Sequence, residues 1–327
     1  MRRGVSCEVA IVVTPNCSLL SALLLAEPLR AANRLSESKP FDHYFASIDG
    51  KNVIASNGFT IPVDRSLKDV KRPQIVALVA SYEQPRLLKE RLLKGFRRQA
   101  RHGATLCGVD LGVLFLAEAG LVGDRRVSVH WETLSTMQEE HPEINATEEL
   151  YAVEKDLMTC GGHTASLDMM LSLIANRFGI DLARAVSNEM LTSGFRPPAT
   201  PQRHLNELEP WSTHPVLGSL VTNMNDQIEQ APKIAELMQS VAGSRRQIEY
   251  LSQRYLGCSP SQYFLGLRLN RSRELILYTN SSISSVATAC GFSSTSSFSR
   301  SFHKHFGDSP TSYRARWRTD LSRPYLK

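Results

Sequence analysis

Apolar residues in the first 195 positions form continuous runs separated by segments of helical length. Residues 7–14 (CEVAIVVT) and 74–80 (QIVALVA) are nearly uninterrupted runs, as in strands that are covered on both faces. Strands that alternate with helices predict a parallel sheet with helices on both sides. The predicted strands are 7–14, 46–49, 58–63, 74–80, 105–109, 127–131 and 150–159, and the predicted helices are 18–35, 85–101, 111–119 and 164–178.

Residues 284–314 have a different pattern, that of two short helices joined by a tight turn. A small apolar segment ends at Gly291, which suits a turn that requires a positive φ. Ser293 and Ser294 then offer N-cap oxygens, and Phe298 and Phe302 are four residues apart on the inner face of the next helix. Because the outer face is polar and basic, the stretch predicts a helix-turn-helix whose second helix enters a DNA groove.

The same unit occurs a second time, fifty residues upstream. The matched pairs are Ser244 and Ser294, Ile248 and Phe298, Arg254 and Lys304, Gly257 and Gly307, Ser259 and Ser309, and Pro260 and Pro310. Residues 244–250 (SRRQIEY) are therefore the predicted first recognition helix. Residues 263–279 have apolar residues at helical spacing, which predicts a connecting helix that fixes the distance between the two units.

A proline-rich stretch separates the two patterns. Residues 196–217 contain five prolines and predict an exposed linker. A chain of 327 residues accommodates about two domains. We therefore expect an α/β domain at 1–195, the linker at 196–217 and an all-α domain with two helix-turn-helix units at 218–327.

Positive charge is concentrated in the region of the repeat. Residues 231–318 include twelve Lys and Arg and four Asp and Glu, a net charge of +8, whereas the whole chain carries +6. The remainder is therefore close to −2. A basic segment that coincides with two helix-turn-helix units is the footprint expected of a protein that binds DNA phosphates. The basic helix at 85–101 coincides with no such unit and is interpreted as a solvated face.

Composition excludes several other classes of protein. No stretch reaches the roughly 18 apolar residues of a membrane span. The apolar run near the N-terminus is short and leads into Pro15, so it predicts a buried strand and not a signal peptide. The six cysteines are scattered without a CxxC pair, which favours a reduced, cytoplasmic protein and predicts neither a zinc site nor a disulfide framework.

The repeat resembles a known family. Residues 259–276 (SPSQYFLGLRLNRSRELI) and 286–314 (VATACGFSSTSSFSRSFHKHFGDSPTSYR) resemble the AraC/XylS transcription regulators, with glycine, proline and aromatic positions in register. The resemblance implies sequence-specific DNA binding, usually as an activator, with one recognition helix of each unit in a major groove. The residues expected to meet bases or phosphates are Arg245, Arg246, Gln247, Tyr250, Thr295, Ser296, Ser297, Arg300 and Lys304.

Some positions depart from the pattern of that family or have another expected role. Tyr250 and Ser297 stand where an arginine and a histidine are common, which leaves the base preference open. Lys304 and Arg314 are the candidates for phosphate contacts. The residues expected to be core and not to read bases are Ile248, Phe298 and Phe302.

The first domain resembles a second family. Residues 103–132 (GATLCGVDLGVLFLAEAGLVGDRRVSVHWE) resemble the nucleophile-elbow segment of the PfpI/class I glutamine amidotransferase-like fold, and residues 159–174 (TCGGHTASLDMMLSLI) fit the same family. The implied fold is a flavodoxin-like parallel sheet. Together with an AraC-type C-terminal part, the layout resembles GlxA-type regulators. Residues 27–36 (EPLRAANRLS) are similar to the subgroup that governs catabolism of arginine, carnitine and glycine betaine.

The elbow lacks the residues that catalytic members of this family use. Asp110 stands at the position of their cysteine, and a carboxylate is a poor nucleophile for acyl or carbonyl chemistry. Leu24 stands where they carry the supporting acid, and Cys107 is expected to be an inert buried thiol. We therefore predict no catalytic residue, no cofactor and no metal.

The elbow crevice is instead predicted to bind an effector, because open α/β sheets bind ligands at the carboxyl ends of their strands. Asp110 would attract a cation, and Trp131 would offer an aromatic face to an ammonium or guanidinium group. Glu27, His163 and Thr164 are further candidates, while a surface carboxylate for Glu27 and a core aromatic for Trp131 stay equally open. The resemblance implies promoter or operator DNA, a second copy of the chain and RNA polymerase as partners, and no membrane.

Two other functions stay open from the sequence. One is a PfpI-like hydrolase or glyoxalase with an appended DNA-binding module, which the missing elbow cysteine disfavours. The other is an architectural DNA-binding protein without a ligand. The sequence names neither the effector, nor the operator, nor the sign of regulation.

Overall fold

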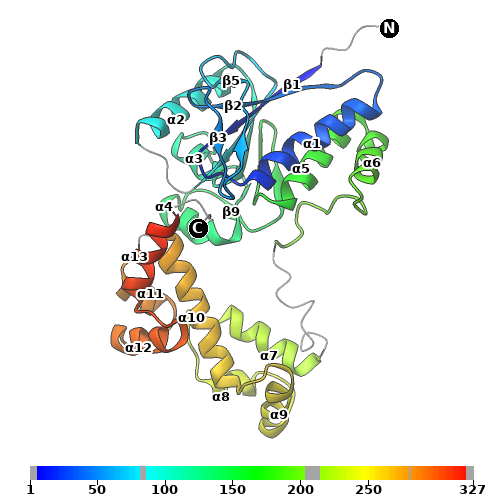
Figure 1. Ribbon diagram of the computed structural model, residues 1–327. Helices are drawn as coiled ribbons and strands as arrows, with labels where there is room; N and C mark the ends of the chain where they lie inside the picture. The colour runs from blue at the N-terminus through cyan, green and yellow to red at the C-terminus, as the bar shows by residue number, and fades with distance from the viewer. Residues whose placement is uncertain (1–5, 82–85, 203–213, 280, 322–327) are drawn as a thin grey trace. The chain divides into compact units, whose positions relative to one another are not determined.

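Contacts within the chain divide it between Gln202 and Arg203 (Figure 1). The computed structural model describes residues 6–81, 86–202, 214–279 and 281–321. Residues 196–202, which the sequence assigns to the linker, bond to the first unit, and Pro215 already begins the first helix of the second. The remaining linker positions, 203–213, lie outside the described residues.

Among the described residues, the first unit is built on a seven-stranded sheet in the order β10-β11-β7-β6-β1-β2-β5. Its strands are β1 (Cys7–Val13), β2 (Phe41–Ser47), β5 (Arg65–Ser66), β6 (Ile75–Ala80), β7 (Thr105–Asp110), β10 (Tyr151–Val153) and β11 (Leu157–Cys160). All neighbouring strands are parallel except β10 and β11. Strand β6 is buried along its whole length and β1 at all but one position, which explains their continuous apolar sequences.

Helices cover both faces of this sheet, as the sequence predicts. One face carries α1 (Leu19–Leu35), α5 (Thr164–Phe178) and α6 (Ile180–Glu189), which lie side by side in Figure 1, and the other carries α2 (Arg86–Arg101) and α3 (Gly112–Glu118). Each face has its own core cluster, because successive residues of β1 point to opposite sides: Ile11 joins the first cluster and Val12 the second.

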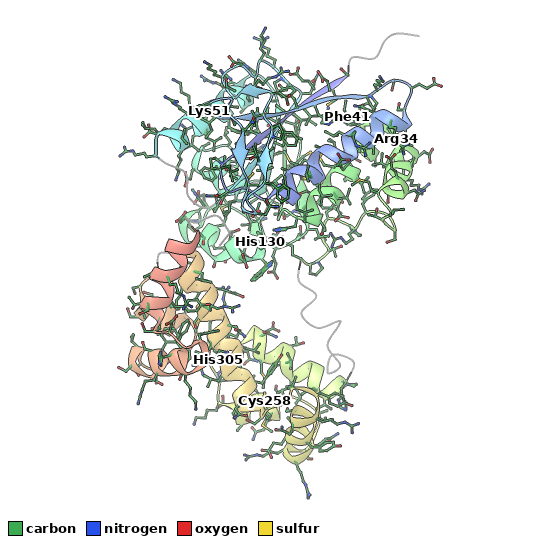
Figure 2. The ribbon with its side chains drawn as sticks, in the orientation of Figure 1. Arg34, Phe41, Lys51, His130, Cys258 and His305 are labelled. Atoms are coloured by element: carbon green, nitrogen blue, oxygen red, sulfur yellow. The ribbon has the colours of Figure 1, made fainter. Side chains whose placement is uncertain are left out.

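Contacts between distant segments hold the first face together. The rings of Phe41 and Phe178 meet edge to face, with centroids 4.9 Å apart. Arg34 on α1 forms an ion pair with Glu189 at the end of α6, and both Arg34 and Phe41 are labelled in Figure 2. The α/β fold class expected from the alternation of strands and helices is therefore confirmed.

The structure corrects some predicted strands. The stretch 150–159 is not one strand but the antiparallel hairpin of β10 and β11, because the polar residues 154–156 form its turn. Of 127–131, only β8 (Val127–Ser128) is a strand, and it pairs with β9 (Ala146–Thr147) outside the main sheet. The expected strand at 46–49 is only the end of β2, whose earlier residues alternate with polar ones.

Several short elements were not predicted or were predicted too long. The two-stranded pair of β3 (Val53–Ile54) and β4 (Thr60–Ile61) includes only two residues of the predicted strand 58–63. The 3₁₀ helix η1 (Trp131–Thr133) and helix α4 (Leu134–Glu140) follow β8. Helices α4 and α6 were both missed by the sequence patterns.

The second unit is all helical in its described residues. Its helices are α7 (Pro215–Asp226), α8 (Ile234–Gln239), α9 (Arg245–Tyr255), α10 (Pro260–Tyr278), α11 (Ile283–Ala289), α12 (Thr295–Phe306) and α13 (Pro310–Leu321). Two core clusters lie within it, one under α7, α8 and α9 and one under α11, α12 and α13. Helix α10 contributes Phe264 to the first and Leu269, Leu275 and Ile276 to the second, so it connects the two helix-turn-helix units as predicted.

The fifty-residue repeat has the same local structure in both copies. Ser244 caps α9 by accepting a hydrogen bond from the Gln247 amide at 3.2 Å, and Ser294 caps α12 through the Ser297 amide at the same distance. Ser259 and Ser309 likewise accept bonds from the amides three residues later. Both predicted recognition helices therefore begin at the predicted serines.

Gly291 makes the turn between α11 and α12. Its φ is +71°, in the left-handed region, and a β-carbon there would lie 2.1 Å from the β-carbon of Ala231. Conformation and space thus both require glycine at this position. The predicted turn is confirmed, and the close neighbour comes from another segment of the chain.

Among the helices of the described residues, none combines the length and the hydropathy needed to cross a bilayer. Within the same residues, no group of three or more His, Cys, Asp and Glu side chains is arranged to hold a metal ion.

Candidate functional site

Helix α9 presents a polar and basic face to solvent. Ile248 and Leu251 are buried in the core of the second unit, which leaves Arg245, Arg246, Gln247 and Tyr250 exposed. The Arg245 guanidinium pairs with Glu249 at 3.0 Å, and the Tyr250 hydroxyl accepts a hydrogen bond from Arg254 at 3.0 Å.

The side chains of Arg246 and Gln247, unlike those of Arg245 and Tyr250, are not paired within this helix, which the structure describes in full. Both are exposed, and neither interacts with another side chain in the part of the chain that the structure describes. Arginine and glutamine are the side chains that bind guanine and adenine in a bidentate manner. They are therefore available to a partner at the start of α9.

Helix α12 repeats this arrangement. Phe298 and Phe302 are fully buried, with ring centroids 5.5 Å apart, so they are core residues as expected. The opposite face exposes Thr295, Ser296, Arg300 and Lys304, while Ser297 is partly buried. In both helices, the side chains predicted to meet DNA thus lie on the face away from the core.

Two arginines of the second unit serve its structure. Arg314 donates from Nε to the Ile276 carbonyl at 3.0 Å and from Nη2 to the Ser281 carbonyl at 2.7 Å. Its guanidinium is partly buried and bonded to these two carbonyls, and the phosphate contact expected of Arg314 stays a prediction. Arg268 similarly donates to the carbonyls of Cys290 and Gly291 and fixes the turn before α12.

The first unit contains the elbow at the end of β7. Asp110 has a φ of +57°, an unfavourable value for a residue with a side chain, and α3 begins two residues later. Burial of the carboxyl group and the nearby charge of Glu132 raise the pKa of Asp110 to about 7, although the Leu111 amide lowers it. Near neutral pH this carboxyl group is therefore poised between its two protonation states.

Two turns bring histidines to the elbow. Gly162 lies against Asp110, because a β-carbon on Gly162 would be 3.1 Å from that of Asp110. The next residue, His163, also has a positive φ, and its amide donates to the Ser21 hydroxyl at 2.7 Å. The imidazole of His130 lies 5.7 Å from that of His163, between ring centroids (Figure 2 labels His130).

The turn that carries His130 also supplies Trp131 and Glu132. The His130 and Trp131 rings are 5.5 Å apart, and the Glu132 carboxylate is 3.7 Å from His130 Nδ1. We call Asp110, His130, Trp131, Glu132 and His163 the elbow site. Glu132 was not among the predicted site residues, and the one signal for it in the sequence is its position directly after His130 and Trp131.

Two predicted effector residues have other contacts. Glu27 lies on α1, where its carboxylate pairs with Arg30 at 2.7 Å and is 43% exposed, which matches the surface interpretation. Burial lowers the pKa of His43, on β2, and the charge of Glu27 partly opposes this. Thr164 follows His163 directly, but its hydroxyl accepts a hydrogen bond from Arg196 at 3.0 Å.

The thiols near the elbow are protonated at neutral pH. Burial, with a smaller contribution from the charge of Asp110, raises the pKa of Cys17 and of Cys160 to about 12. Burial also raises the pKa of Cys107, whose thiol contacts the Met169 sulfur. These thiols are therefore poor nucleophiles.

Leu24, at the position where catalytic members carry the supporting acid, packs against the core of the first face.

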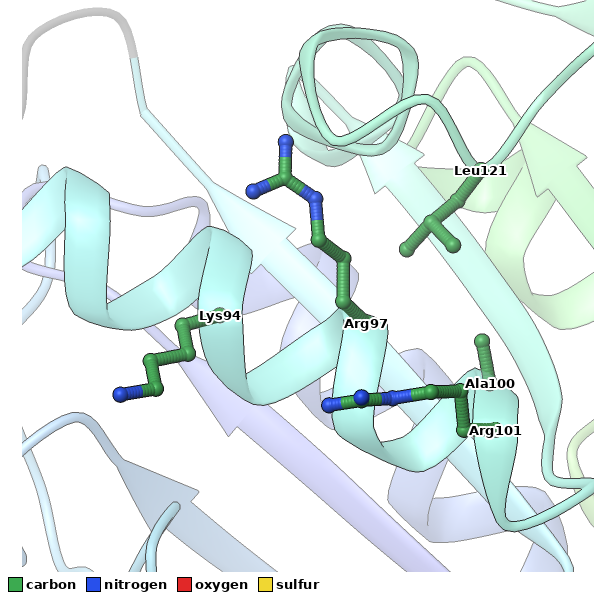
Figure 3. Close-up of a pocket in the computed structure, with 5 residues that line it drawn as sticks. All are labelled: Lys94, Arg97, Ala100, Arg101 and Leu121. Atoms are coloured by element: carbon green, nitrogen blue, oxygen red, sulfur yellow. The ribbon is translucent and has the colours of Figure 1, made fainter.

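A hollow of about 540 Å³ lies elsewhere on the first unit, beside α2 (Figure 3). It is lined by Lys94, Arg97, Ala100, Arg101 and Leu121. Arg97 is held in place by donating to the Ala119 carbonyl at 2.9 Å. None of the lining residues belongs to the elbow site.

Fold and site together define a class of protein: a DNA-binding regulator in which two helix-turn-helix units follow an elbow-bearing α/β unit. A model of the DJ-1/PfpI family matches residues 9–176, and a helix-turn-helix domain model matches residues 237–316. The chain belongs to the DJ-1/PfpI family and, through its AraC-type second unit, to the GlxA-like transcription regulators.

Individual relatives agree with this assignment. The HTH-type transcriptional regulator CdhR of Pseudomonas aeruginosa is 36% identical over 93% of this chain and 90% of its own length. The HTH-type transcriptional regulator GlxA of Rhizobium meliloti is 30% identical over 94% of this chain and 96% of its own. The crystal structure of an AraC family transcriptional regulator from Pseudomonas putida, at 24% identity and a TM-score of 0.52, covers 57% of this chain and 99% of its own, and shares the fold.

Proposed function

We propose that this transcription regulator reads DNA with the first turns of α9 and α12, each in a major groove. The observation that carries the proposal is the repeated, serine-capped helix with a buried apolar face and an exposed polar one. The readers would be the residues predicted from the sequence, with Arg246, Gln247 and Arg300 as the strongest base candidates because their side chains are exposed and uncommitted among the described residues.

We further propose that the elbow site binds a small cationic effector. Two carboxyl groups, Asp110 and Glu132, act on one another there, and a cation between them would relieve their repulsion. The Trp131 ring, whose centroid is 5.5 Å from that of His130, suits an ammonium or guanidinium group. Arginine, carnitine and glycine betaine have such groups, and the resemblance of residues 27–36 favours this chemical class.

The same site supports binding without catalysis. Asp110 occupies the position of the elbow nucleophile, and Cys17, Cys107 and Cys160 hold their protons. The relatives named above are transcriptional regulators. We therefore propose that the chain has no enzymatic activity, acts as an activator in the cytoplasm as a homodimer, and contacts RNA polymerase at the promoter.

A thermal-shift screen of the full-length protein tests the effector proposal. The panel is arginine, carnitine, glycine betaine, choline, dimethylglycine and neutral amino acids, each with the wild type, Asp110→Ala and the control Asp181→Ala. Asp181 is an exposed aspartate on α6. A ligand at about one hundred times its Kd stabilises the native state by about 2.7 kcal/mol, which raises the melting temperature.

We expect a cationic member of the panel to raise the melting temperature of the wild type and of Asp181→Ala, but not of Asp110→Ala. A shift retained in full by Asp110→Ala would place the ligand elsewhere. A response only to neutral amino acids would refute a cationic effector while leaving the DNA-binding proposal intact.

A further inference from the structure

The last described residues before the second unit bond to several segments of the first unit, one of which includes Trp131 of the elbow site. We call residues 196–202 the strap. At its first end, the Arg196 guanidinium holds the buried Asp168 carboxylate at 2.6 and 3.0 Å, and the Arg196 amide donates to the same carboxylate at 2.8 Å. The guanidinium also donates to Thr164, in the first turn of α5 directly after His163.

The middle of the strap bonds to the edge of the main sheet. The Leu150 amide donates to the carbonyls of Pro198 and Thr200, at 3.1 and 3.0 Å. Pro201 forms a β-bridge with Glu149. These backbone contacts keep the strap beside the segment that enters β10.

At its second end, the strap inserts a side chain behind Trp131. The Gln202 amide nitrogen donates to the carbonyls of Val129 and Glu149, at 2.7 and 2.8 Å, and its oxygen accepts from the Trp131 amide at 3.0 Å. Gly161 leaves room for this amide group, because a β-carbon on Gly161 would lie within 2.6–2.7 Å of three of its atoms. The side chain therefore satisfies three backbone groups and fills a fitted space.

The strap thus holds both turns that form the elbow site. Gln202 fixes the backbone of Trp131 and packs on Gly161, and Arg196 fixes the residue after His163. The division between the two units falls directly after Gln202. Gln202 is therefore both a support of the ligand site and the last residue before the segment that leads to the DNA-binding unit.

We propose that the strap couples effector binding to DNA binding, with Gln202 as the positioning residue for Trp131; this rests on the proposed effector site. A bonded strap keeps the two turns in one arrangement, and such preorganisation strengthens ligand binding. Because linkage is reciprocal, the ligand must then stabilise the bonded strap. Occupancy of the elbow site therefore holds the strap in its bonded position, and an empty site lets the strap detach more often.

Two variants of the full-length chain detach the strap in different ways. Gln202→Ala removes the bonding group, and Gly161→Ala adds a methyl group that expels it, at a position without a positive φ. The matched controls are Gln138→Ala, an exposed glutamine on α4, and Gly266→Ala, a helical glycine whose added β-carbon would meet nothing within 4 Å.

Hydrogen exchange without ligand gives the first readout. In both strap variants, we expect the amides of Trp131 and Leu150 to exchange about tenfold faster than in the wild type, because each loses or loosens its acceptor. Both controls should exchange like the wild type. Unchanged exchange at Trp131 and Leu150 in both strap variants would overturn the proposal, whether or not any effector is known.

DNA binding gives the second readout, on a duplex selected in vitro with the full-length protein. The panel member that stabilises the wild-type protein should slow hydrogen exchange in the wild-type strap and change the Kd of the wild type for DNA. Both strap variants should bind that ligand about fivefold more weakly. When saturated with the ligand, they should not show the change in Kd for DNA. If ligand-saturated Gln202→Ala shows the same change in Kd for DNA as the wild type, the proposed coupling is overturned. Ligand binding retained by Asp110→Ala would instead refute the proposed effector site and leave the strap result standing.

Discussion

At the scale of single residues, Asp110 distinguishes this chain most clearly from catalytic members of its fold. It keeps the positive φ of the elbow, so the backbone geometry that exposes a nucleophile is retained. Its carboxyl group is poised near neutral pH because it is buried and faces Glu132. A strained and perturbed residue of this kind is typical of functional sites, even where no catalysis follows.

We expect Asp110→Asn to change how the stability of the first unit depends on pH. The pKa of Asp110 is about 7 when folded, against 3.8 for an ordinary aspartate, so its contribution is fully present below about pH 4 and is lost as the pH rises through about 7. The asparagine variant should match the wild type near pH 4 and exceed it at pH 8, by at most about 4 kcal/mol. Urea unfolding at several pH values measures this.

The control for this experiment is Asp181→Asn, whose side chain is 97% exposed. Its free energy of unfolding should differ from that of the wild type by a small amount that does not depend on pH. If the Asp110→Asn and wild-type curves run parallel between pH 4 and 8, Asp110 titrates at an ordinary pKa in the folded protein.

Gly291 provides a second test at this scale, with Gly307 as its matched control. Both have a left-handed φ, +71° and +81°. A β-carbon added at Gly291 would lie 2.1 Å from the β-carbon of Ala231, whereas one added at Gly307 would have no neighbour within 4 Å. Gly307→Ala should cost about 1–2 kcal/mol of stability through backbone conformation alone. Gly291→Ala should cost about 1–3 kcal/mol more through the clash, measured by unfolding of the full-length protein. Equal losses would show that the turn can move away from Ala231.

At the scale of elements, α9 and α12 each have a buried apolar face and an exposed polar face, which we propose to be the reading face. Their buried residues are apolar, and their capping serines fix where each helix begins. The proposed reading face combines groups that can hydrogen-bond to bases with groups that can neutralise phosphates. These two kinds of contact affect binding differently, because only base contacts carry sequence information.

Arg300→Ala and Lys304→Ala should therefore weaken DNA binding in different ways. Loss of a base contact at Arg300 should cost about 1–3 kcal/mol on the selected duplex and relax specificity at one position. Loss of a phosphate contact at Lys304 should weaken binding to all sequences alike and lower the salt slope by about 1. Titrations against selected and scrambled duplexes at several salt concentrations measure both, with the exposed Arg184→Ala on α6 as control. Identical losses on both duplexes for Arg300→Ala would exclude base reading.

At the scale of the whole molecule, the chain joins two units with separate tasks. Within the second unit, α10 contributes to both core clusters and so sets the distance between the helix-turn-helix units. Its 19 residues correspond to about 28 Å of helix at 1.5 Å per residue. Two major grooves on one face of DNA are about 34 Å apart, which suits two readers held by such a helix.

This geometry predicts a strict half-site spacing. Five extra base pairs between the half-sites would turn one of them to the opposite face of the duplex, so affinity should fall as far as when that half-site is scrambled. The same insertion outside the site serves as control and should have no effect. Competition binding with the full-length protein compares these three altered duplexes with the unaltered one. Undiminished affinity for the spaced duplex would mean that the two units do not read DNA together.

The sequence by itself determined the class of protein, both recognition helices and the glycine turn. These features depend on contacts between residues a few positions apart, such as the cap from Ser294 to Ser297, so local spacing reveals them. The repeat strengthened the prediction because the same local rules applied twice. The absence of a cysteine at Asp110 is equally visible in the sequence.

Only the tertiary structure decided which charged and polar residues act together. It assigned Arg314 and Arg268 to carbonyls, paired Glu27 with Arg30, and placed Gln202 behind Trp131, 71 positions away in the chain. An arginine or glutamine has the same local pattern whether it meets solvent, a carbonyl or DNA. Its partner is chosen by packing between distant segments, and that choice does not appear in any spacing along the chain.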